Sequence, residues 1–384
     1  MIRIDKTYWL VCMIFILGSF IFSFISNINF IGFGSIFIFL LTGFLLSFFT
    51  MIINIPFKDN NNKLVIKNPN LPTLNKVIIL SNIITLIYFF LFIRLNSDTF
   101  EITKIPAEIA FRRYTDSLLM PFYLKILRFS LTIGSILGAI ELAKTKSRPA
   151  LLAILLVFFD GIMSSGKAGP LQGVIYFYYT FIGVRLLYYN KKINFGFKKL
   201  LIIIFVGIIF LVITQAGRIG KIDEDTIYFI LRRLFNYAFG GVNAFDIWLQ
   251  SHTWTESFSF GSETFGGIFD LLGIVERKQG VFQEGVRLGN QPSTNIFTGF
   301  RHLIQDYSYG AFLFITLVLS ILGHKSINQI KSGNISWIFI FTLIQTYITW
   351  IFFSSMFSYN TYIISIFICY LILLLKTRSF RFKY

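Results

Sequence analysis

Long apolar runs separated by short polar connectors dominate this chain of 384 residues. A run of about 20 apolar residues is long enough to cross a bilayer as a helix. The pattern predicts about ten such spans, at residues 8–26, 31–54, 76–95, 122–143, 149–163, 171–189, 199–216, 301–323, 335–353 and 357–375. No small-x-small site follows the first run cleanly, so we expect a retained span and not a cleaved signal. The expected fold class is an all-α polytopic membrane protein.

The spans divide the chain into three parts. Residues 1–216 hold transmembrane helices 1–7, residues 217–300 form a large extracytoplasmic loop, and residues 301–384 hold helices 8–10. Within the loop, residues 226–250 are largely apolar but carry one polar stripe at helical spacing: Arg232, Asn236, Asn243, Asp246 and Gln250. This pattern predicts an amphipathic or re-entrant helix, because lipid does not tolerate such a stripe. The glycine pair at 240–241 invites a kink or break.

The charge of the chain is strongly positive. It contains 35 Lys+Arg and 18 Asp+Glu, which gives a formal net charge of +17. If both termini are cytoplasmic, the inside segments hold 20 of the basic and three of the acidic residues, which accounts for the whole net charge. Cytoplasmic loops of membrane proteins are enriched in Lys and Arg. The positive charge therefore reflects the cytoplasmic location of the basic loops, and no nucleic-acid partner is expected.

Cysteine and histidine give no sign of a metal or redox site. Both cysteines, Cys12 and Cys369, fall inside predicted spans, so no disulfide framework is expected. The three histidines have no spacing typical of zinc ligands. We therefore expect no metal and no cofactor.

Two outer segments carry charges. Residues 96–121 have balanced charges, among them Arg112 and Arg113, which favour a solvated face or else belong to a ligand site. A short surface helix is expected from Pro106, where Glu108 and Arg112 stand at i,i+4. The turn from Ser164 to Leu171 is rich in small residues, which leave backbone N–H groups open to an anion. Lys167 in this turn is a candidate phosphate contact at a helix N-terminus, or else it reaches lipid headgroups from a tight re-entry turn.

Two adjacent polar stripes enter the eighth predicted span. One contains Thr294, Thr298, Arg301, Gln305 and Ser308, and the other contains Asn295, Gly299, His302, Asp306 and Gly310. Charged residues inside a membrane face the protein interior or a water-filled cavity. We expect this helix to face a cavity; alternatively, Arg301 and Asp306 neutralise neighbouring charges.

These features together resemble a known family. The turn at Ser164–Leu171, the long arginine-bearing loop and the Asn-x-x-Thr-x-x-Arg…Asp…Gly run are similar to those of bacterial O-antigen and capsule oligosaccharide repeat-unit polymerases (Wzy type). The resemblance is carried by Ser164 to Leu171, Arg218, Gly240-Gly241, Asn295, Thr298, Arg301, Asp306 and Gly310. Lys167 is a departure, because arginine is expected there in many relatives, and lysine lacks the bidentate fork.

The resemblance implies a glycosyltransferase of the bacterial cytoplasmic (inner) membrane that acts in lipopolysaccharide or other surface polysaccharide biosynthesis. It implies a glycan on polyprenyl (undecaprenyl) diphosphate as donor, a lipid-linked repeat unit as acceptor, and reaction at the outer face, with a chain-length regulator as a possible partner. Arginines near the outer leaflet would bind the diphosphate leaving group. The candidate catalytic residues are Arg301, His302 and Asp306, and the candidate substrate-binding residues are Arg218, Lys167, Arg232, Arg233, Asn295 and Thr298. The general base is open between His302 and Asp306, with His252 and Glu263 further off.

Two other functions stay open at this point. An O-antigen ligase, which transfers the polymer to lipid A core, also relies on a histidine and arginines, and His302 beside Arg301 keeps that reading available. A lipid-linked oligosaccharide flippase should carry charges along several spans and weak internal symmetry, and the sequence has few such charges and no visible repeat.

Overall fold

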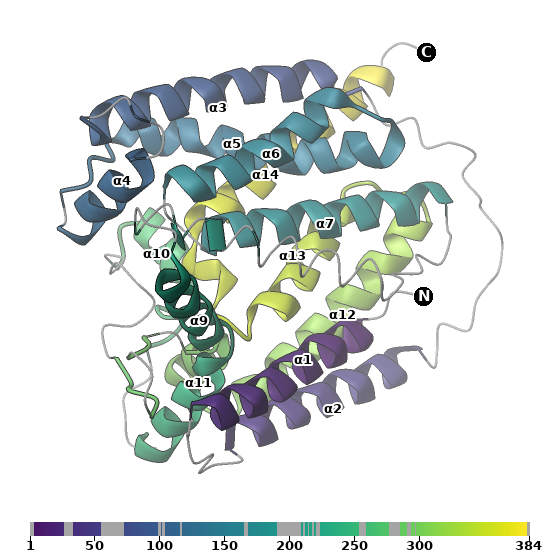
Figure 1. Ribbon diagram of the computed structural model, residues 1–384. Coiled ribbons are helices and arrows are strands. Elements are labelled where there is room, and N and C mark those ends of the chain that lie inside the picture. Colours follow the sequence, from purple (N-terminus) through teal and green to yellow (C-terminus); the bar gives the residue numbers. More distant parts are fainter. Residues whose placement is uncertain are drawn as a thin grey trace. The chain divides into compact units, whose positions relative to one another are not determined.

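The computed structural model describes residues 4–26, 34–54, 73–98, 101, 104–115, 117–164, 168–189, 209, 212–213, 215–216, 219, 223–252, 259–275, 285–289, 293–295 and 297–381. These residues are predominantly helical (Figure 1). The helices are α1 (Ile4–Ile25), α2 (Gly34–Asn54), α3 (Asn75–Asn96), α4 (Ile105–Tyr114), α5 (Phe122–Lys144), α6 (Arg148–Met163), α7 (Ala168–Tyr189), α9 (Glu224–Ser251), α10 (Gly266–Leu271), α11 (Gly299–Tyr307), α12 (Ala311–Lys331), α13 (Trp337–Trp350), the 3₁₀ turn η1 (Met356–Ser358) and α14 (Asn360–Arg381). One antiparallel bridge pairs Val286 with Thr294.

Five helices within the described ranges are long and apolar enough to cross a membrane. They are Ile4–Ile25, Gly34–Ile53, Asn75–Asn96, Phe122–Lys144 and Leu313–Lys331. Large apolar side chains such as Phe24, Phe44 and Phe90 are exposed on them, as lipid-facing residues would be. The structure therefore supports a helical membrane protein. The expected total of ten spans and the orientation of the termini stay predictions, and most of the seventh span, 199–216, lies outside the described residues.

The chain forms two compact units. Unit 1 comprises Met1–Val65, Arg232–Ser332 and Leu343–Asn360, and unit 2 comprises Ile66–Leu231, Gly333–Thr342 and Thr361–Tyr384. In unit 1, α2 packs against both α1 and α12. The Tyr8 hydroxyl donates to the Phe39 carbonyl at 2.8 Å, and Trp9 Nε1 donates to Ser47 Oγ at 2.9 Å. Hydrogen bonds that link helices in this way supplement packing between apolar surfaces that lipid would otherwise cover.

In unit 2, α5 is the central helix and packs against α3, α6 and α7 (Figure 1). A side chain at Gly134 would approach Ser81 Oγ to 3.1 Å, so the missing Cβ permits the close approach of α3. The Ser81 hydroxyl donates to the Ser130 carbonyl at 2.6 Å, and Asn82 Nδ2 donates to the Pro149 carbonyl at 2.9 Å. Ser147 caps α6 by accepting a hydrogen bond from the backbone N–H of Ala150.

Three local predictions meet clear outcomes. The surface helix expected from Pro106 is α4, and Arg112 lies 3.6 Å from Glu108 as its i,i+4 spacing predicts. The amphipathic helix expected at 226–250 is α9, which continues as one helix through the glycine pair, so a break there is excluded and a kink stays a prediction. The eighth span was expected as one helix over 301–323; instead, α11 ends at Tyr307 and α12 begins at Ala311.

The break after α11 has a backbone cause. Ser308 has φ 61°, in the left-handed region that L residues other than glycine, asparagine and aspartate seldom adopt. An α-helix cannot continue through this conformation. The apolar stretch that can span therefore shifts to Leu313–Lys331, and α11 becomes a separate helix of nine residues that carries the polar stripes.

Candidate functional site

The centre of the site in unit 1 is Arg301, which is only 1% exposed. Its guanidinium carbon lies 4.1 Å from the ring centroid of Phe297 and 5.0 Å from that of Trp248. The Trp248 ring in turn stacks on the imidazole of His252, with centroids 4.3 Å apart. A desolvated cation over an aromatic face gains about 2 kcal/mol. Aromatic rings from two segments therefore fix the position of the guanidinium.

His302 follows Arg301 and is also buried, at 2% exposed. Its Nδ1 lies 3.9 Å from Oε2 of Glu263, whose side chain is 42% exposed. Burial lowers the pKa of His302 from 6.5 to about 4; the charge of Asp306 opposes this effect and that of Arg301 adds to it. The imidazole is therefore neutral at physiological pH, which is the state that a general base requires.

Asp306 accepts hydrogen bonds from three donors of one loop. Its Oδ1 accepts from Ser259 Oγ at 2.5 Å and from the backbone N–H of Glu263 at 3.1 Å. Its Oδ2 accepts from the backbone N–H of Thr264 at 2.5 Å. The Ser355 hydroxyl donates to the Thr264 carbonyl at 2.6 Å, which ties the same loop to the segment before η1. Asp306 thus holds the loop that carries Glu263 beside His302.

The residues before α11 have distinct environments. Thr298 is buried at the N-cap position, yet its side chain makes no capping hydrogen bond, and its hydroxyl has no partner within the described part of the chain. Asn295 is exposed. Gly299 donates its backbone N–H to the Ile351 carbonyl at 2.6 Å, and a Cβ there would lie 2.8 Å from the Ser354 carbonyl oxygen. Only glycine fits this approach, which fixes where α11 begins.

The polar stripe of α9 is explained mainly by packing within unit 1. The Asp246 carboxylate accepts from the backbone N–H of Ser35 at 3.1 Å, at the first turn of α2, and Gln250 Nε2 donates to the same carboxylate at 3.2 Å. Asn243 Nδ2 donates to Ser23 Oγ on α1 at 3.0 Å. These hydrogen bonds attach α9 to α1 and α2.

Arg232 and Arg233 lie far along α9 from the guanidinium of Arg301. Arg232 is half-buried, and Arg233 donates to the Tyr237 hydroxyl at 3.3 Å. Sixteen residues of one helix separate Arg232 from Trp248, a rise of about 24 Å. One phosphate group cannot bridge that distance. Their role in substrate binding stays a prediction, and it concerns another part of the substrate.

Two of the expected site residues cannot be placed. Lys167 and Arg218 lie outside the described residues. In the loop beside Asp306, Phe265 packs against Phe357 at 5.2 Å between ring centroids, whereas Phe260 is exposed. The described residues also contain no group of three or more His, Cys, Asp or Glu side chains able to hold a metal ion.

Sequence reasoning missed four residues of the site: Trp248, Phe297, Ser259 and Thr264. Phe297 stands four residues before Arg301, a spacing that could have suggested contact. Trp248 is 53 positions away from Arg301 and has no local signal. Ser259 and Thr264 bind Asp306 through a loop conformation with φ 46° at Phe260 and 94° at Gly261. This conformation cannot be predicted from the spacing of residues in the sequence.

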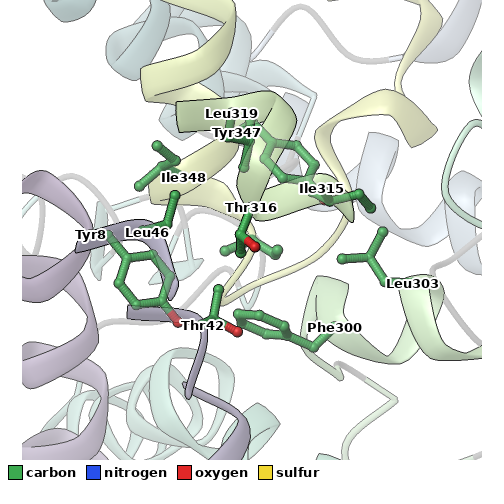
Figure 2. A pocket seen from close by; sticks show the side chains of 11 residues that line it. Tyr8, Thr42, Leu46, Phe300, Leu303, Ile315, Thr316, Leu319, Tyr347 and Ile348 are labelled. Atoms are coloured by element: carbon green, nitrogen blue, oxygen red, sulfur yellow. The ribbon is translucent and has the colours of Figure 1, made fainter. Parts of the chain in front are cut away.

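The apolar face of α11 borders a small apolar cleft whose free space is about that of one water molecule (Figure 2). Phe300 and Leu303 contribute from α11, and the other lining residues come from α1, α2, α12, α13 and the turn after α13: Tyr8, Thr42, Leu46, Ile315, Thr316, Leu319, Tyr347, Ile348 and Ile351. Arg301 and His302 lie on the opposite, polar side of α11. The helix therefore separates a charged site from an apolar cleft.

Comparison with protein-family models, with curated proteins and with solved structures finds no match.

Proposed function

We propose that this protein is a glycosyltransferase that polymerises polyprenyl-diphosphate-linked oligosaccharide repeat units into a bacterial surface polysaccharide. The observation that carries the proposal is Arg301, a buried guanidinium held between two aromatic rings and directly followed by a neutral histidine. The bond that breaks joins the anomeric carbon of the donor glycan to a diphosphate oxygen. Negative charge develops on the diphosphate, and a fixed guanidinium stabilises it best where water is excluded.

His302 is the residue we assign as general base. Its neutral imidazole accepts the proton of the acceptor hydroxyl as that oxygen attacks the anomeric carbon, and polyprenyl diphosphate leaves with the bonding electron pair. Glu263, at 3.9 Å from Nδ1 and partly exposed, then takes the proton toward solvent. Asp306 is already bound to three donors, so we assign it the positioning of this loop and not the proton transfer.

The apolar surfaces of the membrane-spanning helices support an amphiphilic substrate. A polyprenyl diphosphate combines a charged head with a long hydrocarbon chain, and the chain can remain in lipid while the head binds to the protein. A soluble nucleotide sugar has no hydrocarbon chain to remain in the membrane. In the expected topology, the reaction takes place at the outer face of the cytoplasmic membrane, with both termini inside.

Deletion of the gene in its own host tests this function against the two alternatives. A polymerase deletion leaves lipid A core, or the corresponding acceptor, capped with one repeat unit. If long polymer accumulates on the lipid carrier, the protein is a ligase; if single units accumulate on the cytoplasmic side, it is a flippase. Unchanged surface polysaccharide in the deletion strain contradicts all three.

A further inference from the structure

Unit 2 contains a second cationic cluster, outside the site described above. Arg113 on α4 and Arg128 on α5 lie near Asp160 on α6. Arg128 Nη2 lies 2.8 Å from Asp160 Oδ2, and the Tyr88 hydroxyl donates to Asp160 Oδ1 at 3.4 Å. The Asp160 side chain is buried, while that of Arg128 is 32% exposed. Asp160 pairs directly with Arg128, and Arg113 lies near enough to feel the charges of both, so the cluster has an excess positive charge.

The position of Arg113 follows from the spacing of α4. Ile105 and Ile109 are buried in the apolar core of unit 2, and Arg113 continues their i,i+4 row. This row turns the Arg113 side chain inward, where burial and the charge of Arg128 lower its pKa. Arginine still stays protonated at physiological pH, because its ordinary pKa is so high. The fold thus brings a positive charge toward a site that already holds another.

Nearby acidic groups in the described ranges are engaged elsewhere. Glu108 accepts from Ser97 Oγ at 2.6 Å and from the backbone N–H of Asp98 at 2.9 Å. Asp98 pairs with Arg112 at 2.5 Å, and Glu101 pairs with Lys104 at 2.7 Å. Arg112, the sequence neighbour of Arg113, therefore has two carboxylates on the surface. Asp160 alone of these acids faces Arg113 and Arg128.

The N-terminus of α7 meets the same cluster. An ideal Cβ on Gly169 would lie 3.9 Å from Arg128 Nη2, and the Tyr362 hydroxyl donates to the Gly169 carbonyl. The first turn of a helix presents unsatisfied backbone N–H groups and the positive end of the helix dipole. Arg128 thus lies beside a helix N-terminus, with the charge of Arg113 near it, which is an arrangement suited to an anion.

Buried polar atoms on either side of the turn point to a missing ligand. Gln172 is fully buried, one turn into α7, and neither its amide oxygen nor its amide nitrogen has a hydrogen-bond partner in the described part of the chain. Long side chains in a helix lean toward its N-terminus, so the amide leans toward the first turn of α7. The buried Ser164 hydroxyl, at the end of α6, also lacks a partner there. Buried polar groups are nearly always hydrogen-bonded.

We propose that Arg113, Arg128 and the first turn of α7 bind one phosphate group, with Gln172 and Ser164 as additional hydrogen-bond donors. Arg128 uses one N–H group on Asp160 and retains others for the ligand. The phosphate neutralises the excess charge that Asp160 leaves. Its source is either the headgroup of a membrane lipid or a soluble phosphate. This site does not depend on the glycosyl transfer proposed above.

The decisive experiment uses full-length protein purified in a neutral detergent and monitors binding by native mass spectrometry. One titration adds phosphatidylglycerol, and a parallel one adds inorganic pyrophosphate. Arg113→Gln is expected to weaken binding about tenfold or more, because a charge-assisted contact is lost. Arg112→Gln, one residue away and paired at the surface, is the matched control and is expected to bind as the parent does. Binding of pyrophosphate assigns a soluble ligand, and binding of phosphatidylglycerol alone assigns a lipid.

Asp160→Asn is expected to raise the affinity for phosphate, whereas Arg113→Gln lowers it. Removing the competing carboxylate frees Arg128 and strengthens phosphate binding several-fold, whereas a cluster that serves only as an ion pair would gain no affinity. Arg113→Lys preserves the charge without the planar fork, and an intermediate affinity is expected. Equal binding by Arg113→Gln and Arg112→Gln overturns the proposal, as does weaker binding by a correctly folded Asp160→Asn. If neither ligand binds the parent protein, the site does not exist.

Discussion

The carboxylate of Glu263 lies 3.9 Å from Nδ1 of His302, although the two residues are 39 positions apart in the chain. One group is partly exposed and the other is buried, so the pair connects the interior of the site with its surroundings. The contact exists because Asp306, one turn after His302, binds the backbone N–H groups of Glu263 and Thr264. An acid–base pair is thus positioned by a third residue.

The first prediction concerns Arg301. Arg301→Ala is expected to abolish long-chain surface polysaccharide while the protein still accumulates in the membrane, because the cation that stabilises the leaving diphosphate is removed. Arg301→Lys should restore only part of the chain length, since a point charge cannot stack on both rings. Gel analysis of the polysaccharide measures this, with Arg112→Ala as the control. Normal chain length in Arg301→Ala removes this residue from the site.

The second prediction concerns Trp248, which we expect to position Arg301. Trp248→Phe preserves an aromatic face under the guanidinium and should keep most activity. Trp248→Ala removes the face and should shorten the polymer by lowering kcat more than it raises KM. Tyr228→Ala, an exposed aromatic on the same helix, is the matched control. Equal activity of the alanine and phenylalanine variants at position 248 argues against the positioning role.

The third prediction is the pH dependence of activity. Because burial lowers the pKa of His302 to about 4, a base at this position loses activity only as pH falls toward 4. The rate should be flat with respect to this group from about pH 5.5 upward, whereas an ordinary histidine would already be half protonated at 6.5. Transfer between purified lipid-linked units measures the profile. His302→Gln should lose activity at every pH, and His324→Gln should keep the parental profile.

The fourth prediction is the pH dependence of stability. The pKa of His302 is lower in the folded protein than in the unfolded chain, so below 6.5 the unfolded chain binds the proton more readily. Stability is therefore complete above pH 6.5 and is lost as pH falls from 6.5 to about 4, by about 3 kcal/mol at most. Melting temperatures in detergent across this interval should fall less steeply for His302→Gln. Parallel curves for parent and variant contradict the assignment.

The fifth prediction separates the role of Asp306 from that of His302. Asp306→Asn turns one acceptor into a donor that faces other donors, and it should destabilise the protein by about 1–3 kcal/mol. Activity should fall, but the shape of the pH profile should not change, because Asp306 is not the titrating base. Asp98→Asn, at an exposed ion pair, should change stability by about 1 kcal/mol or less. If the decrease of activity at low pH disappears in Asp306→Asn, then Asp306 and not His302 is the general base.

Several parts of the site follow directly from sequence spacing. Arg301, His302 and Asp306 lie on the polar side of a helix because they stand at i, i+1 and i+5, and an α-helix brings these positions to neighbouring sides. The pairing of Glu108 with Arg112 follows from the same geometry. The amphipathic character of α9 can also be predicted from the sequence, because polar residues recur along it at helical intervals. Helical periodicity is local, so it can be inferred without a tertiary structure.

Other parts had no local signal. Ser308 breaks the helix that the apolar pattern predicts as one span, because a backbone conformation outweighs the pattern. The sequence left Arg113 on a solvated face or in a ligand site, and the row from Ile105 and Ile109 turns it inward once α4 packs on α3 and α6. Asp246 and Asn243 belong to the polar stripe that predicted an amphipathic or re-entrant helix, and the structure pairs them with Ser35 and Ser23. Each outcome depends on which helix becomes a neighbour.

The sequence by itself determined that the chain is a helical membrane protein and that charges gather at the beginning of one late helix. The length of the apolar runs and the helical period of the polar residues carry this information. Both can be read locally, because each residue prefers either water or lipid independently of distant segments. Only the tertiary structure decided that Arg301 lies between Phe297 and Trp248, that Asp306 holds the loop of Glu263, and that Arg113 approaches Arg128. Burial and neighbouring charge set the chemistry of these groups, and both arise when distant segments pack together.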